Sequence, residues 1–265
     1  MSTKTKESIS LGVIIGNRDF FPDKLVGECR SDLMAVFAKL GIKPIMLTEA
    51  DSKLGGIETF QDAQKCAALF RKHADEIMGV LVVLPNFGDE KGVAETLKLA
   101  RLNVPVLIQA YPDDLNKMDV ARRRDSWCGK ISVCNNLYQF GIKYTLTTTH
   151  VVHPSDASFH TDLHNFVGVC RVVKGLQNVR IGAVGARPGA FNTVRYSEKI
   201  LQRNGISVVT VDLSQILGDA NKLTKDDGSV KERLEKIRAY TPVGRTPDDK
   251  LVQIAKLDVV LANFM

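Results

Sequence analysis

The first half of the chain alternates short apolar runs with segments whose apolar residues recur every three or four positions. The runs are rich in Val, Ile and Leu, which is typical of strands buried on both faces. They cover residues 11–16, 43–48, 79–85 and 104–111. Helical periodicity occupies the segments between them, at about residues 25–40, 60–70 and 93–102. This alternation predicts a parallel sheet with helices on both faces, so we expect an open, flavodoxin-like α/β domain.

A second α/β domain is predicted after a long helix. A helical segment at residues 128–141 and a threonine-rich strand at 144–149 are followed by Pro154 and Ser155, which open that helix. A strand–helix–strand pattern then returns at residues 179–185, 191–204 and 206–212. We therefore expect a first domain at residues 1–150, a bridging helix at 151–176 and a second Rossmann-like, parallel-sheet domain at 177–265.

The end of the sequence has the composition of a buried parallel strand. Charged helices are predicted at about residues 230–240 and 247–256, and LDVVLANFM follows at residues 257–265. A parallel strand needs cover on both faces and a loop beyond its carboxyl end. Because nothing follows Met265, we expect the second domain to be incomplete and the chain to be the front part of a longer polypeptide.

Composition excludes several classes of protein. With 265 residues, 44% of them hydrophobic and 25% charged, the chain has the balance of a folded protein. It contains no apolar run of about 18 residues and no signal peptide, so we expect a cytoplasmic protein without a membrane partner. Five scattered cysteines, none in a CxxC pair, argue against a disulfide framework and a thiolate zinc site.

The positive charge does not predict a nucleic-acid partner. The net charge of +6 is spread along the chain. Its densest cluster, residues 122–124, is flanked by Asp119 and Asp125, which is typical of a solvated or ion-paired loop. No interleaved aromatic residues or nucleic-acid motif accompany the cluster, so we expect no nucleic acid to bind.

Candidate ligand-binding residues stand at the predicted strand ends, where open parallel sheets bind their ligands. They are Asn17 and Arg18, Asn86 and Phe87, Gln109 and Tyr111, and, in the second domain, Arg187. Amide and guanidinium groups beside aromatic rings suit a polyhydroxylated, sugar-like ligand. The alternative interpretation is that the asparagines form turns and the arginines are surface charges.

Searches for other chemistry are mostly negative. The glycines of residues 182–189 are spaced GxxGxxxG rather than GxGxxG, although Asp212 ends the next strand as a ribose-binding acid would. His160 and His164 share a helical face, but no further ligand is evident, and a structural pair is the preferred interpretation. His150 and His153 are similarly ambiguous. No nucleophile motif or paired acid/base carboxylates are found.

Five segments, taken in order, resemble the N-terminal region of the L-fucose/L-arabinose isomerase superfamily, in particular its fucose-isomerase-like members. They are LGVIIGNRDFFP, GVLVVLPNFGDEKG, VPVLIQAYPDDL, DSWCGKISVCNNLYQFGI and NVRIGAVGARPGAFNTVRYSEKIL. The resemblance runs from about residue 11 to residue 265. It implies a flavodoxin-like N-terminal domain, a second α/β domain and a C-terminal β-rich domain.

The resemblance implies a metal-dependent ketol isomerase that interconverts an aldose and a ketose, using a divalent cation, usually manganese. In such enzymes the metal ligands and the acid/base carboxylate lie at the far end of the second domain and in the C-terminal domain. It therefore implies no catalytic or metal-binding residue in this chain, with the Mn²⁺ ligands expected beyond Met265. It also implies a homo-oligomer whose sugar pockets are shared between subunits. The residues that it places in the substrate pocket are Arg18, Asn86, Phe87, Gln109 and Arg187.

Two other functions stay open at this point. One is a stand-alone sugar-binding module with two α/β lobes and no catalysis. The other is a nucleotide-dependent enzyme that uses the glycine-rich loop at residues 182–189. For the leading interpretation, the expected partners are a sugar substrate, the remainder of the polypeptide and further copies of the chain.

Overall fold

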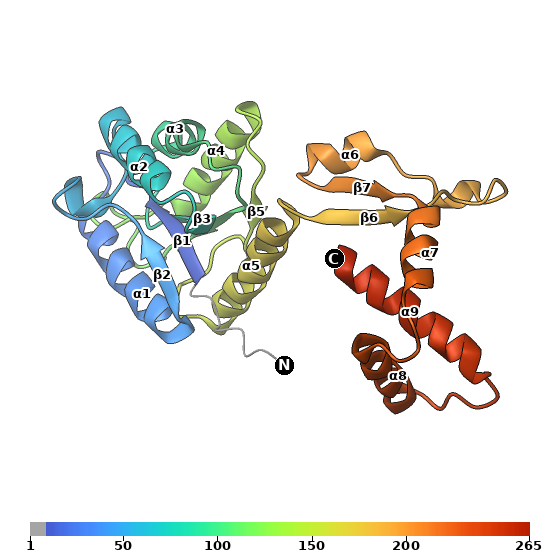
Figure 1. The fold of residues 1–265 in the computed structure, drawn as a ribbon. Helices are drawn as coiled ribbons and strands as arrows, with labels where there is room; N and C mark the ends of the chain where they lie inside the picture. The colour runs from blue at the N-terminus through green and yellow to red at the C-terminus, as the bar shows by residue number, and fades with distance from the viewer. Residues whose placement is uncertain (1–8) are drawn as a thin grey trace. The chain divides into compact units, whose positions relative to one another are not determined.

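The computed structural model describes residues 9–265, which form two compact α/β units (Figure 1). Unit 1 ends at Lys174 and unit 2 begins at Gly175. The polar residues 1–8, assigned by sequence to the first domain, lie outside the described residues. The predicted α/β class is confirmed, and each unit contains a parallel sheet. No helix in the described part of the chain combines the length and hydropathy that crossing a bilayer requires.

Unit 1 contains a five-stranded parallel sheet in the order β2-β1-β3-β4-β5. Its strands are β1 (Ile9–Ile15), β2 (Ile42–Ile45), β3 (Ile77–Leu84), β4 (Val106–Ala110) and β5 (Thr145–Leu146). Every residue of β1, β3 and β4 is buried, including the polar Ser10 and Gln109, as the mainly apolar composition of these strands predicts. The strand order reverses direction between β1 and β3, and in such sheets a crevice opens at this switch point beyond the carboxyl ends.

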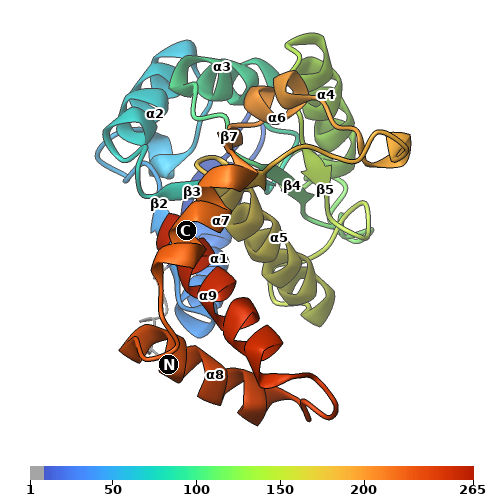
Figure 2. The same ribbon diagram turned by 45° about the vertical axis from the view of Figure 1, so that its right-hand side comes forward.

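Helices cover both faces of this sheet. The helices are α1 (Lys24–Leu40), α2 (Phe60–Lys72), α3 (Glu90–Ala100), α4 (Ser126–Gln139) and α5 (Ala157–Leu176), with a short 3₁₀ turn, η1 (Lys53–Gly55). In both views α1 and α5 lie on one side of the sheet and α2, α3 and α4 on the other (Figure 1, Figure 2). Two separate apolar cores result, one beneath each helical layer.

The helix α5, expected to bridge two domains, is part of the core of unit 1. Its apolar face, with Phe159, Leu163 and Phe166, is buried with residues of α1 and the sheet. The contact is close, because a Cβ added to Gly79 of β3 would lie 2.4 Å from the Cys170 sulfur. The boundary between the two units, at residues 174/175, falls within the last turn of α5, so nearly all of this helix belongs to unit 1.

Unit 2 pairs a two-stranded parallel sheet with four helices in the described residues. The strands are β6 (Arg180–Val184) and β7 (Ser207–Val211). The helices are α6 (Glu198–Arg203), α7 (Leu213–Lys222), α8 (Gly228–Tyr240) and α9 (Asp248–Phe264), with a 3₁₀ turn, η2 (Asn192–Val194). The helix expected from residue 191 therefore begins only at Glu198. Two small apolar clusters hold α7, α8 and α9 together.

The strand predicted at residues 257–265 is wrong, because this segment is helical to Phe264. Leu251, Ala255 and Val259 recur every four residues and are all buried on one face of α9. Val259 packs with Val230 of α8, and the adjacent Val260 packs with Ile216 of α7. The segment is partly buried, as its composition indicates, but its period is that of a helix. The sequence argument for an incomplete domain that rested on this strand therefore loses its support.

Candidate functional site

Two asparagines lie at the switch point, and their side chains join the loops that follow β1 and β3. Asn86 Nδ2 donates to Asn17 Oδ1 over 2.6 Å, and Asn17 Nδ2 donates to Glu58 Oε2 over 2.7 Å and to Asp23 Oδ1 over 3.1 Å. Asn86 Oδ1 accepts from the Gly88 amide. Both asparagines are buried, so their amides fix the two loops against each other. Contact of Asn86 with a sugar stays a prediction.

Arg18 and Phe87, which extend from these two loops, form a cation–π pair. The Arg18 guanidinium carbon lies 4.5 Å from the centre of the Phe87 ring. The Phe21 ring lies 6.1 Å from that of Phe87, and the Arg123 guanidinium carbon lies 5.5 Å from the Phe21 ring. Two arginines thus flank two aromatic rings at the carboxyl end of the sheet. The structure brings the predicted residues Arg18 and Phe87 together here.

Gln109, at the carboxyl end of β4, holds the segment that leads into α5. Its side chain is buried, and Nε2 donates to the Val152 carbonyl over 2.5 Å. The Val152 amide in turn donates to the Ala110 carbonyl over 2.9 Å, so this segment continues beside β4. Gln109 Oε1 is buried without a hydrogen-bond partner among the described residues. The predicted sugar contact of Gln109 stays a prediction, whereas the structure shows that it positions the residue after Val152, His153.

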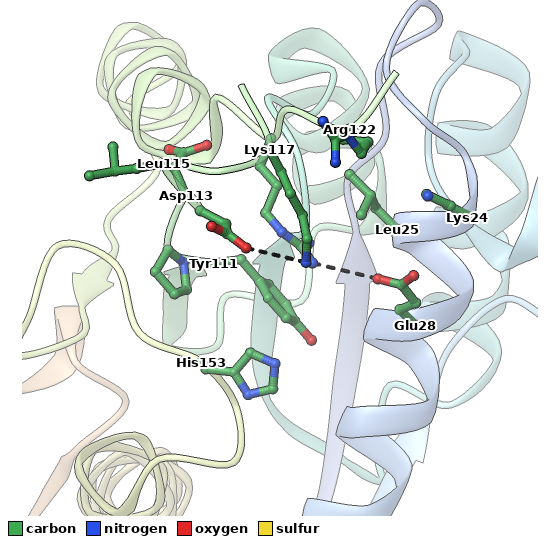
Figure 3. A pocket seen from close by; sticks show the side chains of 12 residues that line it. Lys24, Leu25, Glu28, Tyr111, Asp113, Leu115, Lys117, Arg122 and His153 are labelled. Atoms are coloured by element: carbon green, nitrogen blue, oxygen red, sulfur yellow. Dashed lines mark ion pairs between the residues drawn. The ribbon is translucent and has the colours of Figure 1, made fainter. Parts of the chain in front are cut away.

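A pocket of about 640 Å³ lies next to this edge, between the start of α1 and the loop that follows β4 (Figure 3). None of the five residues predicted to bind substrate lines it. The lining residues are Lys24, Leu25, Glu28, Tyr111, Pro112, Asp113, Asp114, Leu115, Lys117, Arg122, Arg124 and His153. Tyr111 stands at a strand end and was a visible candidate. Arg124 belongs to the arginine cluster for which the sequence indicates a solvated or ion-paired loop.

Tyr111 and His153, which form the floor of this pocket, both contact Asp32 of α1. Asp32 Oδ2 accepts from the Tyr111 hydroxyl over 3.0 Å and lies 3.3 Å from His153 Nε2. The Ser155 amide donates to His153 Nδ1, and the other ring nitrogen, Nε2, faces Asp32. Burial, together with the nearby Cys29 and Asp32, raises the pKa of Tyr111 far above its ordinary value. Tyr111 is therefore a neutral hydrogen-bond donor.

Arg124 connects this floor to the switch point. Its Nη1 donates to the Pro85 carbonyl, just before Asn86, over 2.8 Å, and its guanidinium carbon lies 4.8 Å from the Tyr111 ring. Its Nη2 lies 3.5 Å from Glu28 Oε2 in a loose ion pair, drawn as a dashed line in Figure 3. The pocket is thus lined by hydrogen-bond donors and acceptors, and by side chains of positive and of negative charge. Such a lining suits a polyhydroxylated molecule.

In unit 2, Arg187 is exposed and bonds to its own loop. Its Nη1 lies 3.3–3.4 Å from the carbonyls of Pro188, Gly189 and Phe191. Asp212, considered as a ribose-binding acid, instead caps α7, since its Oδ1 accepts from the Ser214 amide over 2.7 Å. That bond lowers the pKa of Asp212. Unit 2 thus places Arg187 beside a strand end, and the acid that the nucleotide interpretation relies on, Asp212, serves as a helix cap.

The described residues do not fit a bound divalent cation. Within residues 9–265, no three His, Cys, Asp or Glu side chains are grouped so that they could hold a metal ion. His164 is exposed, and His160 Nε2 is buried without a hydrogen-bond partner in the described part of the chain.

The sequence of unit 1 matches a known protein family. A family model described as the N-terminal domain of fucose/sulfoquinovose isomerases matches residues 12–177, more than half of the chain. This range covers β1 to α5, and so nearly the whole of unit 1 and the switch point. No curated protein matches the sequence.

Proposed function

Because the chain belongs to the fucose/sulfoquinovose isomerase family through its N-terminal domain, we propose that it supplies the substrate-lining part of a ketol isomerase. The reaction is the interconversion of an aldose and a ketose. The Arg18–Phe87 pair at the β1/β3 switch point carries the proposal. The ring offers an apolar face to the carbon skeleton of a sugar, and the guanidinium offers fixed N–H donors to its hydroxyl groups.

The buried side-chain amides of Asn86 and Gln109 hold the loops around this pair in place. In the proposal, Asn86 fixes the Phe87 loop against the Arg18 loop, and Gln109 fixes the segment that carries His153. By family resemblance, Arg187 is also proposed as a substrate-binding residue. These residues bind and orient the substrate and exclude water from it, and none of them is assigned a proton transfer.

The remaining parts of the enzyme are assigned by family resemblance. The proposal places the manganese ligands and the acid/base carboxylate outside these 265 residues. It also places the enzyme in the cytoplasm as a homo-oligomer with sugar pockets shared between subunits. A divalent cation would polarise the sugar oxygens between which the proton moves.

The first test uses residues 1–265 alone. Calorimetric titration with manganese and assays for ketose formation from L-fucose, sulfoquinovose and a panel of other aldoses measure what this chain does by itself. We expect no micromolar manganese affinity and no turnover. Turnover, or a micromolar dissociation constant for manganese, would show that the chain is catalytically complete. Sugar binding by the isolated chain without turnover in the complete enzyme would support the binding-module alternative.

The second test uses the complete enzyme. Arg18→Ala should raise KM or lower turnover about 10- to 100-fold, because a hydrogen bond to the sugar worth about 1–3 kcal/mol is lost. Arg171→Ala, which removes an exposed arginine of α5, is the matched control and should leave the kinetics unchanged. If Arg18→Ala and Phe87→Leu both retain wild-type kinetics, the switch point does not bind the sugar.

A further inference from the structure

A second pocket, of about 470 Å³, lies at the amino end of β4. It is lined by Val80 of β3 and Val106 of β4, which are register partners in the sheet, by the last turn of α3 and by the loop that follows α4. The helices α3 and α4 lie side by side on this face of the sheet (Figure 1). We call this the amino-end pocket. The switch point lies beyond the carboxyl ends of the strands, at the opposite end of the sheet.

The amino-end pocket combines an apolar lining with charge of one sign. Five apolar side chains of the lining are buried or half-buried: Val80, Leu97, Val104, Val106 and Ile142. Its charged residues are Lys98, Arg101 and Lys143, and no carboxylate lines it within the described residues. The pocket drawn in Figure 3, by contrast, is lined by both charges. The whole chain has 36 basic and 30 acidic residues, so three cations without an acid is not its average surface.

Two of the three cations are available to a ligand. Lys98 Nζ lies 3.3 Å from Glu95 Oε2, so its charge is partly neutralised. Arg101 and Lys143 are exposed, and neither forms an ion pair with another described residue. Both can therefore turn to an anionic group in the pocket without breaking an existing pair.

Arg101 stands where a helix usually ends in glycine. It is the C-cap of α3, with φ 53° and ψ 36°, and its amide donates to the Leu97 carbonyl. Glycine adopts this left-handed conformation without the steric penalty that a Cβ brings. The chain itself has Gly41, with φ 66°, at the same position of α1. Residues held in such a conformation cluster at functional sites, so an arginine here indicates that its side chain has a binding role.

We propose that the amino-end pocket binds a small organic acid, that is, a carboxylate attached to an apolar body. The Arg101 guanidinium and the Lys143 ammonium group hold the carboxylate through charge-assisted hydrogen bonds. The apolar body packs on Val80 and Val106, and the area that it buries adds to the affinity. A volume of about 470 Å³ lies within the range of small-molecule sites. This inference does not depend on the proposed isomerase function, because the two sites lie at opposite ends of the sheet.

The probe is phenylbutyrate, which joins a carboxylate to a phenyl ring through a short aliphatic chain. It is titrated into the isotope-labelled chain, and the amide resonances of the protein are followed by NMR. We expect saturable shifts that concentrate at residues 97–106 and 141–143. Phenylbutyramide, a neutral analogue of the same shape, should bind about 10-fold more weakly or worse, because it forms no charge-assisted bond. Acetate, which lacks the apolar body, should also bind more weakly than phenylbutyrate.

Two glycine substitutions separate the charge of Arg101 from its backbone conformation. Arg101→Gly removes the cation and relieves the left-handed strain, so it should weaken phenylbutyrate binding about 10-fold and raise the melting temperature. Asn103→Gly is the matched control, because Asn103 also lines the pocket and has φ 51°. It keeps all three cations and should leave the affinity unchanged. A gain in thermal stability together with a loss of affinity is not expected of a residue with a purely structural role.

Charge reversal provides a second test. Lys143→Glu should weaken phenylbutyrate binding about 10- to 100-fold, because it replaces an attraction by a repulsion. Lys91→Glu makes the same change at an exposed position of α3 outside the pocket, and it should leave the affinity unchanged.

Four results would overturn the proposal. The first is the absence of saturable shifts up to the solubility limit of phenylbutyrate. The second is equal affinity for phenylbutyrate and phenylbutyramide, because the cations would then play no part. The third is a set of shifts that lies outside residues 97–106 and 141–143. The fourth is unchanged affinity in both Arg101→Gly and Lys143→Glu, because the carboxylate would then be held elsewhere.

Discussion

The two units bury very similar strands to very different extents. All eight residues of β3 in unit 1 are buried, whereas Ile181 and Val184 of β6 in unit 2 are each 42% exposed. Both strands are rich in Val and Ile and both belong to parallel sheets. The difference lies in the cover: helices lie on both faces of the first sheet, while α7, α8 and α9 bury their apolar residues mainly against one another. Apolar composition thus predicts a strand, but neighbouring elements decide its burial.

The largest difference between the units is expected at alkaline pH. Unit 1 should lose more stability than unit 2, because it contains every cysteine of the chain. Burial raises the pKa of the Cys29 and Cys170 thiols to about 12 and that of Cys66 as well. In the unfolded chain these thiols ionise near their ordinary value of 9.0. The stability that they contribute is present below about pH 9 and is lost as pH rises toward the folded-state values, at about 1.4 kcal/mol per pH unit for each thiol.

Lys130 opposes this trend. Burial lowers its pKa from 10.5 to about 8, so its contribution to the free energy of unfolding increases with pH between these two values. The buried thiols outnumber this one lysine, so unit 1 should show a net loss of stability, on the order of a few kcal/mol per pH unit, between about pH 9 and 10.5. Denaturant unfolding followed by Trp127 fluorescence measures it for unit 1. Cys66→Ala should make the slope shallower by one thiol's share. A stability of unit 1 that does not change over this range would contradict the burial of these groups.

Substitution of one glycine in each unit compares how tightly the two units are packed. A Cβ at Gly129 of α4 would lie 1.7 Å from the Phe87 carbonyl oxygen, whereas one at Gly182 of β6 meets nothing within 4 Å. Gly129→Ala should lower the free energy of unfolding by about 3 kcal/mol or more, because backbone has to move. Gly182→Ala should change it by less than about 1 kcal/mol, in the stabilising direction. Urea unfolding of both variants measures this, and equal effects would remove the packing difference between the units.

The sequence predicts the fold of unit 1 well because each of its long strands is apolar on both faces and is separated from the next by a helix. It fails at α9. The run at residues 257–265 is short and apolar, and short apolar runs in strands and buried helices have the same composition. It also fails for α5, since an apolar helical face does not reveal which sheet it covers.

Some features of the candidate site also follow from the sequence, and others do not. The proximity of Arg18 and Phe87 follows from the sequence, because parallel topology brings the carboxyl ends of adjacent strands together. Burial of Asn86 does not, since a turn asparagine and an interior one have the same local sequence. The Tyr111–Asp32 bond joins residues 79 positions apart, and no local pattern indicates such a contact. Long-range polar pairs of this kind depend on packing that only the structure shows.

The smallest expected change in stability comes from a comparison of two predicted site residues, one in each unit. Asn86→Ala leaves the Gly88 amide and Asn17 Oδ1 without their partner in a buried region, so it should cost about 1–3 kcal/mol of stability. Arg187→Ala removes only long bonds at an exposed loop and should change stability by less than about 0.5 kcal/mol. Thermal unfolding of the two variants and wild type decides between them. An Arg187→Ala variant as destabilised as Asn86→Ala would mean that the Arg187 loop is held as firmly in unit 2 as the switch point is in unit 1.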